Sequence, residues 1–159
     1  MKWIDLTVPL GIGTPPWPSY EPLQVKYSKR LATDGANSQL VSHSNHVGTH
    51  LDGEIHFYAP GKDIASLELN GFLVGPGVIV DLSNATGDYH IYTSKMIEDR
   101  VEVRPRDILI IHTGYHHFGW DHPTADEIRY MVKHPGPDRE FADWCRRREI
   151  RWIGVDCGS

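Results

Sequence analysis

Short apolar runs, separated by glycine- and proline-rich stretches, recur along the chain. Runs rich in valine and isoleucine are typical of buried strands, and apolar residues three or four positions apart are typical of helices. On this basis, strands are predicted over residues 3–10, 23–29, 74–82, 107–112 and 150–156. Helical elements are predicted over residues 64–67, 93–98 and 138–148, with Thr93 or Ser94 as the N-cap of the second. Strands outnumber helices, so the pattern predicts an α/β or α+β fold.

The densest group of chemically active side chains lies in residues 46–56. Three histidines and two carboxylates all occupy even positions there: His46, His50, Asp52, Glu54 and His56. In an extended segment, side chains two positions apart share a face. The pattern therefore predicts a strand with one face of metal-binding or proton-transfer groups and an opposite apolar face.

A bend is expected within this segment, because a straight strand would separate His46 from Asp52 by about 20 Å. Gly48 permits the bend, since glycine accepts backbone angles that other residues avoid. His46, His50 and Asp52 can then converge on one ion. Imidazole nitrogens and a carboxylate oxygen suit Zn²⁺ or Mn²⁺, and three protein ligands with an open position are typical of a catalytic site. A zincin-type helix is disfavoured by Gly48 and Gly53 and by the β-branched residues Val47, Thr49 and Ile55.

The pattern His46-x-Gly48-Thr49-His50-x-Asp52, followed by His56, resembles the signature of the cyclase family of metal-dependent hydrolases, which includes bacterial kynurenine formamidases and isatin hydrolases. The resemblance implies that His46, His50 and Asp52 bind one or two Zn or Mn ions. It also implies that His56 is the general base or acid. Segments similar to the family's core extend the resemblance over nearly the whole chain: residues 3–10, 17–18, 108–114 and 152–156.

The same resemblance implies a swivelling β/β/α fold with a small, barrel-like mixed sheet. It implies a single cyclase-like domain over residues 1–159 that lacks the C-terminal part of the family fold, where members carry a further His and Glu. A homo-oligomer is expected, and a second chain is a possible source of those ligands. Gly53 and Glu54 stand where many members have Ala-Pro or Ser-Pro, so Glu54 is a weaker candidate for substrate contact.

Two other substrate-contact candidates lie outside this segment. Trp17 lies in the loop predicted over residues 11–22, where aromatic residues could form an apolar wall for a planar substrate. His112 ends a predicted strand and begins a second histidine group with His116, His117 and His122. The spacing of His112 to these residues matches no known ligand set, and the additional histidines are expected to be exposed in a loop.

Composition narrows the possible partners. A chain of 159 residues is the size of one domain, and its formal net charge of -5 does not favour nucleic acid. No apolar run approaches the ~20 residues of a membrane span, and no signal-type stretch follows Lys2, so no membrane partner and a cytoplasmic location are expected. Cys145 and Cys157 have no disulfide-framework or zinc-ribbon spacing and are expected to be free thiols.

The histidine segment predicts a metal-dependent hydrolase, and the family resemblance implies an amidohydrolase that cleaves a C–N bond in a small formamide or cyclic amide. Water activated by the metal would attack the carbonyl, and His56 would transfer the proton to the leaving nitrogen. Two alternatives stay open. The same site could hydrolyse an ester or lactone, or the chain could be a non-catalytic metal-binding subunit.

Overall fold

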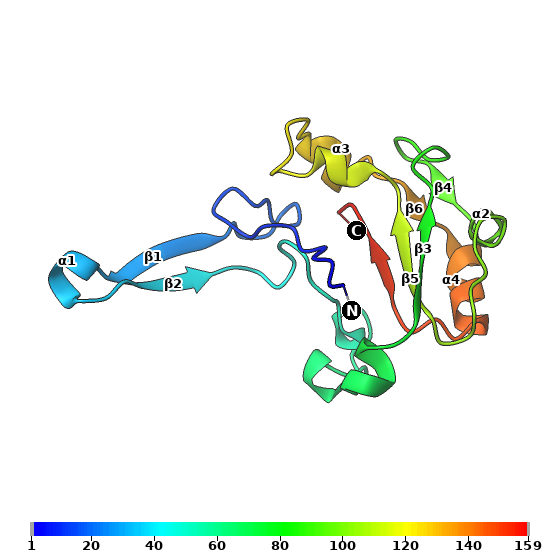
Figure 1. Cartoon of the computed structure of the whole chain (residues 1–159), viewed down its shortest axis with the longest axis horizontal. Coiled ribbons are helices and arrows are strands. Elements are labelled where there is room, and N and C mark those ends of the chain that lie inside the picture. The colour runs from blue at the N-terminus through cyan, green and yellow to red at the C-terminus, as the bar shows by residue number, and fades with distance from the viewer. Residues whose placement is uncertain (1, 159) are drawn as a thin grey trace. The chain divides into compact units, whose positions relative to one another are not determined.

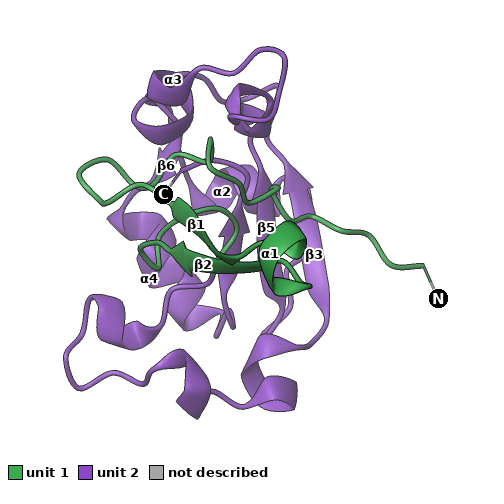
Figure 2. Ribbon diagram, turned by 90° about the vertical axis from the view of Figure 1, so that its left-hand side faces the viewer, with its two compact units in different colours: residues 1–50 green, residues 51–159 purple. Residues whose placement is uncertain are grey.

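A computed structural model describes residues 2–158 of the chain. The chain consists of two compact units, residues 1–50 and 51–159. Figure 1 shows the elements of both units, and Figure 2 distinguishes the units by colour.

The first unit consists of a β-hairpin and a loop. Strand β1 (Gln24–Lys29) pairs antiparallel with β2 (Ser38–Ser42), and the short helix α1 (Leu31–Asp34) lies between them. The strand predicted over residues 23–29 is therefore confirmed. The strand predicted over residues 3–10 is wrong: this segment has no partner strand, and Trp3 is 84% exposed. An apolar run forms a strand only where a neighbour accepts its backbone hydrogen bonds.

The second unit is built on a parallel three-stranded sheet. Its strands are β3 (Gly77–Asp81), β5 (Ile108–His112) and β7 (Ile153–Val155), in the order β3-β5-β7. All three were predicted, with somewhat wider bounds. The register pairs Asp81 with His112, so the carboxyl ends of β3 and β5 meet at the same edge of the sheet.

One face of this sheet is buried by α2 (Ser94–Glu98) and α4 (Arg139–Arg147), which lie on the same side of it in Figure 1. Both helices were predicted. Asp138 caps α4 by accepting a hydrogen bond from the amide of Phe141. At α2, Thr93 occupies the N-cap position without a side-chain bond. The core of the unit is formed by Val80, Leu82, Tyr92, Ile97, Val103, Leu109, Ile111, Phe141 and Trp144.

Short elements complete this unit. Strands β4 (Ile91–Tyr92) and β6 (Gly136–Pro137) form a two-residue parallel pair, and α3 is a single turn (Glu127–Met131). The remaining turns are η1 (Glu54–His56), η2 (Ile64–Ser66), the π-helical η3 (Leu69–Leu73) and η4 (Tyr115–Phe118). The predicted mixed α/β class is confirmed, and the sheets of residues 2–158 do not close into a barrel. Within the same residues, no helix has the length and apolar character needed to cross a membrane.

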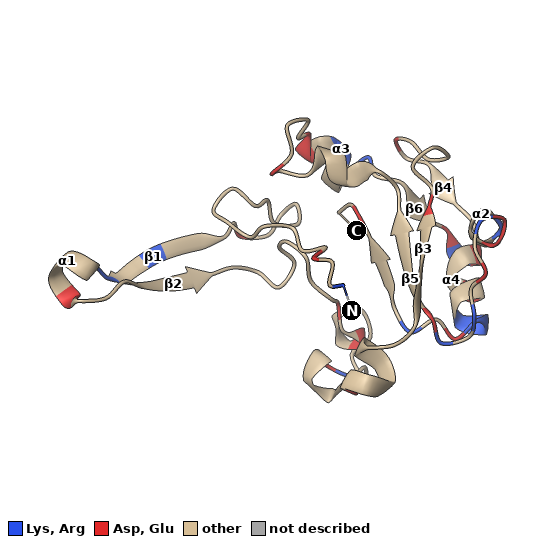
Figure 3. Cartoon of the chain, viewed as in Figure 1, with Lys and Arg blue, Asp and Glu red and all other residues tan. Residues whose placement is uncertain are grey.

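Charged residues of both signs are interspersed along the ribbon (Figure 3). The basic cluster Arg146–Arg148 closes α4, and two of its members face acidic side chains. Arg148 contacts Glu98 at 2.7 Å, and Arg147 lies 3.9 Å from Glu140. The cluster is therefore partly neutralised within its own unit.

Candidate metal centre

The first cluster consists of His46, His50 and Asp52. Each residue offers one ligand atom, and these atoms all lie within 4.8 Å of one another. His46 Nδ1 and His50 Nε2 are 3.3 Å apart, and the two rings meet edge to face. The predicted convergence of these three side chains is present.

The chain achieves this convergence by a bend and not by a strand. Residues 46–53 form no strand apart from a single bridge between Val47 and Pro16, so the predicted extended segment is wrong. Gly48 adopts a left-handed φ of 64°, which glycine accepts without the steric cost of a side chain. A Cβ at this position would meet Leu10 Cδ1 at 3.2 Å. The bend predicted at Gly48 is the feature that brings the imidazoles together.

Hydrogen bonds orient the ligands. His50 Nδ1 lies 2.8 Å from the carbonyl oxygen of Gly48, which can only accept, so Nδ1 carries the proton and Nε2 keeps its lone pair. A backbone carbonyl that fixes the histidine tautomer is the usual second partner of a metal ligand. The carbonyl of His46 is held in turn by the amide of Trp17 at 3.1 Å. The donor set and its orientation therefore fit a divalent cation.

The remaining predicted residues of the segment lie in or beside η1. The ring of His56 lies against that of Phe57, with centroids 4.1 Å apart and planes tilted by 56°. Glu54 accepts a hydrogen bond from the amide of Lys62, which closes the turn around Gly61. This contact gives Glu54 a structural role. Catalysis by His56 and substrate contact by Glu54 and Trp17 stay predictions.

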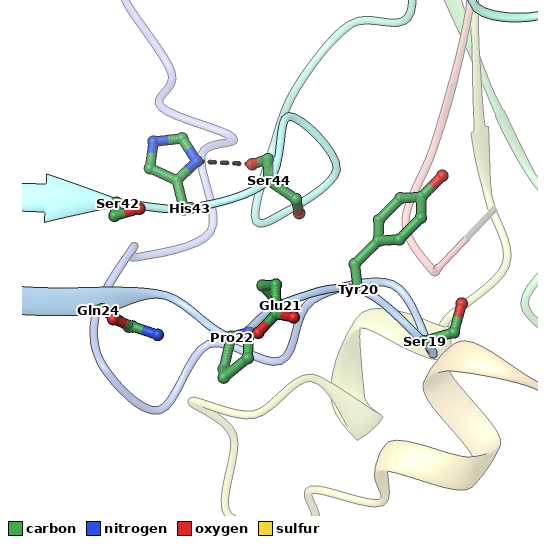
Figure 4. Close-up of a pocket in the computed structure, with 8 residues that line it drawn as sticks. All are labelled: Ser19, Tyr20, Glu21, Pro22, Gln24, Ser42, His43 and Ser44. Atoms are coloured by element: carbon green, nitrogen blue, oxygen red, sulfur yellow. Dashed lines mark hydrogen bonds between the residues drawn. The ribbon is translucent and has the colours of Figure 1, made fainter.

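A cavity of about 520 Å³ opens at the end of the hairpin. Figure 4 shows residues 19–22 and Gln24 on one side of it and residues 42–44 on the other. Among its lining residues, Tyr20 also approaches the first cluster, because its ring centroid lies 5.5 Å from that of His46. The cavity is thus adjacent to one ligand of the cluster.

A second cluster forms where the strands of the parallel sheet end. His116 Nδ1 lies 3.0 Å from Asp156 Oδ2, and His112 Nε2 lies 3.6 Å from the same oxygen. One ligand atom of each residue lies within 4.8 Å of the others. Spacing along the chain pointed to no ligand set for His112, but the structure places it in a group that could hold an ion. Asp156, the third member of the group, is distant in sequence. Substrate contact by His112 stays a prediction.

Asp156 is the most firmly held member of this cluster. Its Oδ1 accepts hydrogen bonds from the amide and hydroxyl of Thr113, at 2.7 and 2.6 Å, and Oδ2 accepts one from the amide of Gly114 at 2.8 Å. Burial raises the pKa of Asp156, but bonds from Thr113, His116 and Gly114 outweigh that effect and hold the pKa below its ordinary value. Asp156 is therefore a carboxylate at neutral pH.

The two cysteines are free, as predicted. Burial raises the pKa of Cys157 to about 12 and that of Cys145 to about 11. A thiol must lose its proton to act as a nucleophile. Neither cysteine is therefore suited to nucleophilic catalysis at neutral pH.

Sequence reasoning overlooked His116 and Asp156 as a potential ligand pair. One signal could have found them: the carboxyl ends of parallel strands meet at one edge of a sheet, where site residues collect. Asp81, His112 and Asp156 all stand at or just beyond such strand ends. The sequence also repeats one pattern, because His112-x-Gly114-x-His116 has the same form as His46-x-Gly48-x-His50.

The fold and the first cluster define a class of mixed α/β proteins that present two histidines and an aspartate to a divalent cation. The model of one protein family, described as putative cyclase, matches residues 4–159 of the chain. The chain belongs to the cyclase family, and the predicted resemblance is confirmed.

Curated relatives and solved structures agree with this assignment. The chain is 29% identical to a kynurenine formamidase of Bacillus cereus, over 99% of its own length and 69% of the relative's. It is 28% identical to a kynurenine formamidase of Geobacillus thermodenitrificans, with the same coverage. Isatin hydrolase A from Ralstonia solanacearum has a similar fold, with a TM-score of 0.80 at 22% identity. That likeness covers 96% of this chain but 65% of the solved chain, so this chain spans less than two thirds of it.

Proposed function

We propose that this chain is a metal-dependent hydrolase that cleaves the C–N bond of a small formamide or cyclic amide. The observation that carries the proposal is the convergence of His46, His50 and Asp52 around a bend at Gly48. The relatives' names support the reaction class, since kynurenine formamidases and isatin hydrolases act on a formamide and a cyclic amide.

The bound ion, Zn²⁺ or Mn²⁺, would polarise the substrate carbonyl and lower the pKa of water. His46, His50 and Asp52 would hold the ion, and the carbonyl of Gly48 fixes the ring of His50 in the tautomer whose Nε2 could bind it. Tyr20, beside His46 at the cavity, would contact a planar substrate.

His56 performs the proton transfers in this proposal. It would take a proton from the attacking water and give it to the leaving nitrogen as the C–N bond breaks. A formamide would then give formic acid and an amine, and a cyclic amide would open to a single amino acid. This role requires that His56 does not bind the ion itself. A cytoplasmic location and a homo-oligomeric state accompany the proposal as predictions from the sequence and the family.

The test compares His56→Ala with His90→Ala, an exposed histidine outside both clusters. We expect His56→Ala to retain the wild-type metal content and to lose about 10²–10⁴-fold in turnover of an aryl formamide. His90→Ala should match the wild type in both. Loss of metal in His56→Ala would contradict its assignment as the proton carrier.

Substrate panels separate the alternatives. Hydrolysis of aryl lactones or esters without any hydrolysis of formamides would replace the amide assignment by the ester alternative. Stoichiometric metal with no hydrolysis of either class would identify the chain as a metal-binding subunit.

A further inference from the structure

The second cluster repeats the local geometry of the first. In both, two histidines four residues apart flank a central glycine with positive φ, 64° at Gly48 and 82° at Gly114. The ring centroids of the two histidines are 5.2 Å apart in each cluster. We infer that His112, His116 and Asp156 form a second site for a divalent transition-metal ion, made by residues that the proposed hydrolytic site does not use.

The spacing of the ligand atoms fits an ion. Zn²⁺ binds histidine nitrogen and carboxylate oxygen at about 2.0–2.2 Å, so neighbouring ligand atoms of a tetrahedral site lie about 3.3–3.6 Å apart. The distances from Asp156 Oδ2 are 3.0 Å to His116 Nδ1 and 3.6 Å to His112 Nε2. The longer distance is in this range, and the shorter one is about 0.3 Å below it.

A second carboxylate orients His112 toward the site. Asp81 Oδ1 lies 3.2 Å from His112 Nδ1, so that Nδ1 donates to Asp81 and Nε2 faces Asp156. Asp81 is itself held by the amide of Ser83 at 2.9 Å. A carboxylate on the outer nitrogen of a histidine is the common support of a zinc ligand, because it fixes the ring and raises its basicity.

Asp156 is oriented as a ligand, and its side chain remains partly accessible to solvent. Thr113 occupies its Oδ1, which directs Oδ2 toward the two imidazoles. The side chains of His112 and His116 are 36% and 42% exposed, and that of Asp156 is 17% exposed. An ion can therefore enter from solvent. Two imidazoles and one carboxylate select Zn²⁺ or a similar transition metal over Mg²⁺ and Ca²⁺, which prefer oxygen ligands.

The site would connect three elements of the second unit. His112 ends β5, His116 lies in η4, and Asp156 follows β7. An ion bound by all three links a turn to the edge of the sheet. Because such binding occurs only in the folded chain, it raises stability by mass action.

The test uses ZnCl₂ and the full chain carrying His46→Ala and His50→Ala, so that failure of the hydrolytic site does not affect the result. Calorimetric titration should give one Zn²⁺ per chain in this background. Adding His116→Ala should remove that binding. Adding His117→Ala, the adjacent exposed histidine, should leave it unchanged.

Two further measurements distinguish loss of a ligand from misfolding of the His116 variant. Asp81→Asn keeps every ligand and should weaken Zn²⁺ binding by about 10–100-fold. The melting temperature of the parent double variant should rise with Zn²⁺, and the rise should vanish when His116 is replaced. Absence of Zn²⁺ binding in the double variant would overturn the proposal. Loss of Zn²⁺ binding on His117→Ala would also overturn it, because the ion would then be bound at the His117–His122 pair.

Discussion

The two histidine clusters share one local motif and differ in the origin of the carboxylate. In the first, Asp52 follows His50 by two residues, so all three ligands belong to one loop. In the second, Asp156 lies 40 residues beyond His116 and reaches it only because β5 and β7 are neighbours. A motif within one loop can be read from sequence, whereas a site completed by a distant strand requires the sheet.

The clusters also differ in how firmly the chain holds them. Three hydrogen bonds from Thr113 and Gly114 hold Asp156, and Thr113 is 2% exposed. In the first cluster, both His50 and Asp52 are exposed. The second cluster is therefore expected to contribute to stability without an ion, and the first to depend on its ion for order.

The largest expected effect concerns catalysis at the first cluster. His50→Ala should lower kcat/KM toward an aryl formamide by about 10³-fold or more. The metal would stabilise the transition state by several kcal/mol, and each tenfold change in rate corresponds to about 1.4 kcal/mol of activation free energy. His90→Ala is the matched control in steady-state assays. Wild-type turnover in His50→Ala would show that the first cluster is not catalytic.

The next effect concerns the sheet that assembles the second cluster. Leu109 is fully buried in β5, so Leu109→Ala should lower the free energy of unfolding by about 2–5 kcal/mol. The control is Leu40, which is 62% exposed in the hairpin. Leu40→Ala should lower the free energy of unfolding by less than about 0.5 kcal/mol. Urea unfolding measures both. Equal effects would contradict the sheet's role as the stable frame.

A smaller effect distinguishes the two carboxylates. With metal removed by EDTA, Asp156→Asn should lower the free energy of unfolding by about 1–3 kcal/mol. The side-chain NH₂ of asparagine, in place of Oδ2, cannot accept the hydrogen bonds that Oδ2 accepts. Asp52→Asn, at an exposed position, should cost less than about 0.5 kcal/mol under the same conditions. Chemical denaturation compares them. A larger cost at Asp52 would reverse the proposed difference in anchoring.

The smallest effect tests what the clusters share. Gly48→Ala and Gly114→Ala should each lower the free energy of unfolding by about 1–2 kcal/mol, because alanine is strained at positive φ. Gly87, where a Cβ would meet nothing within 4 Å, is the control, and Gly87→Ala should be nearly neutral. Thermal unfolding detects the difference. A neutral Gly48→Ala would mean that the bend does not depend on glycine.

Much of the fold followed from local pattern. The apolar runs that became β3, β5 and β7 are rich in valine and isoleucine, and α4 (Arg139–Arg147) lies within the helix predicted over residues 138–148. The failures have a common cause. Residues 3–10 look like a strand but have no neighbour to pair with, and β4 and β6 exist only because two distant residue pairs meet. Pairing is a property of the folded chain.

The sequence by itself determined the first cluster, because its ligands, its bend and the family signature all lie within eleven residues. It also determined the family, through a motif that spacing alone makes recognisable. The tertiary structure decided the second cluster. Asp81, His112 and Asp156 come from three strands, and only the parallel register of the sheet brings their ends to one edge. Short-range geometry is encoded by neighbouring residues, whereas convergence of distant ligands depends on how the whole core packs.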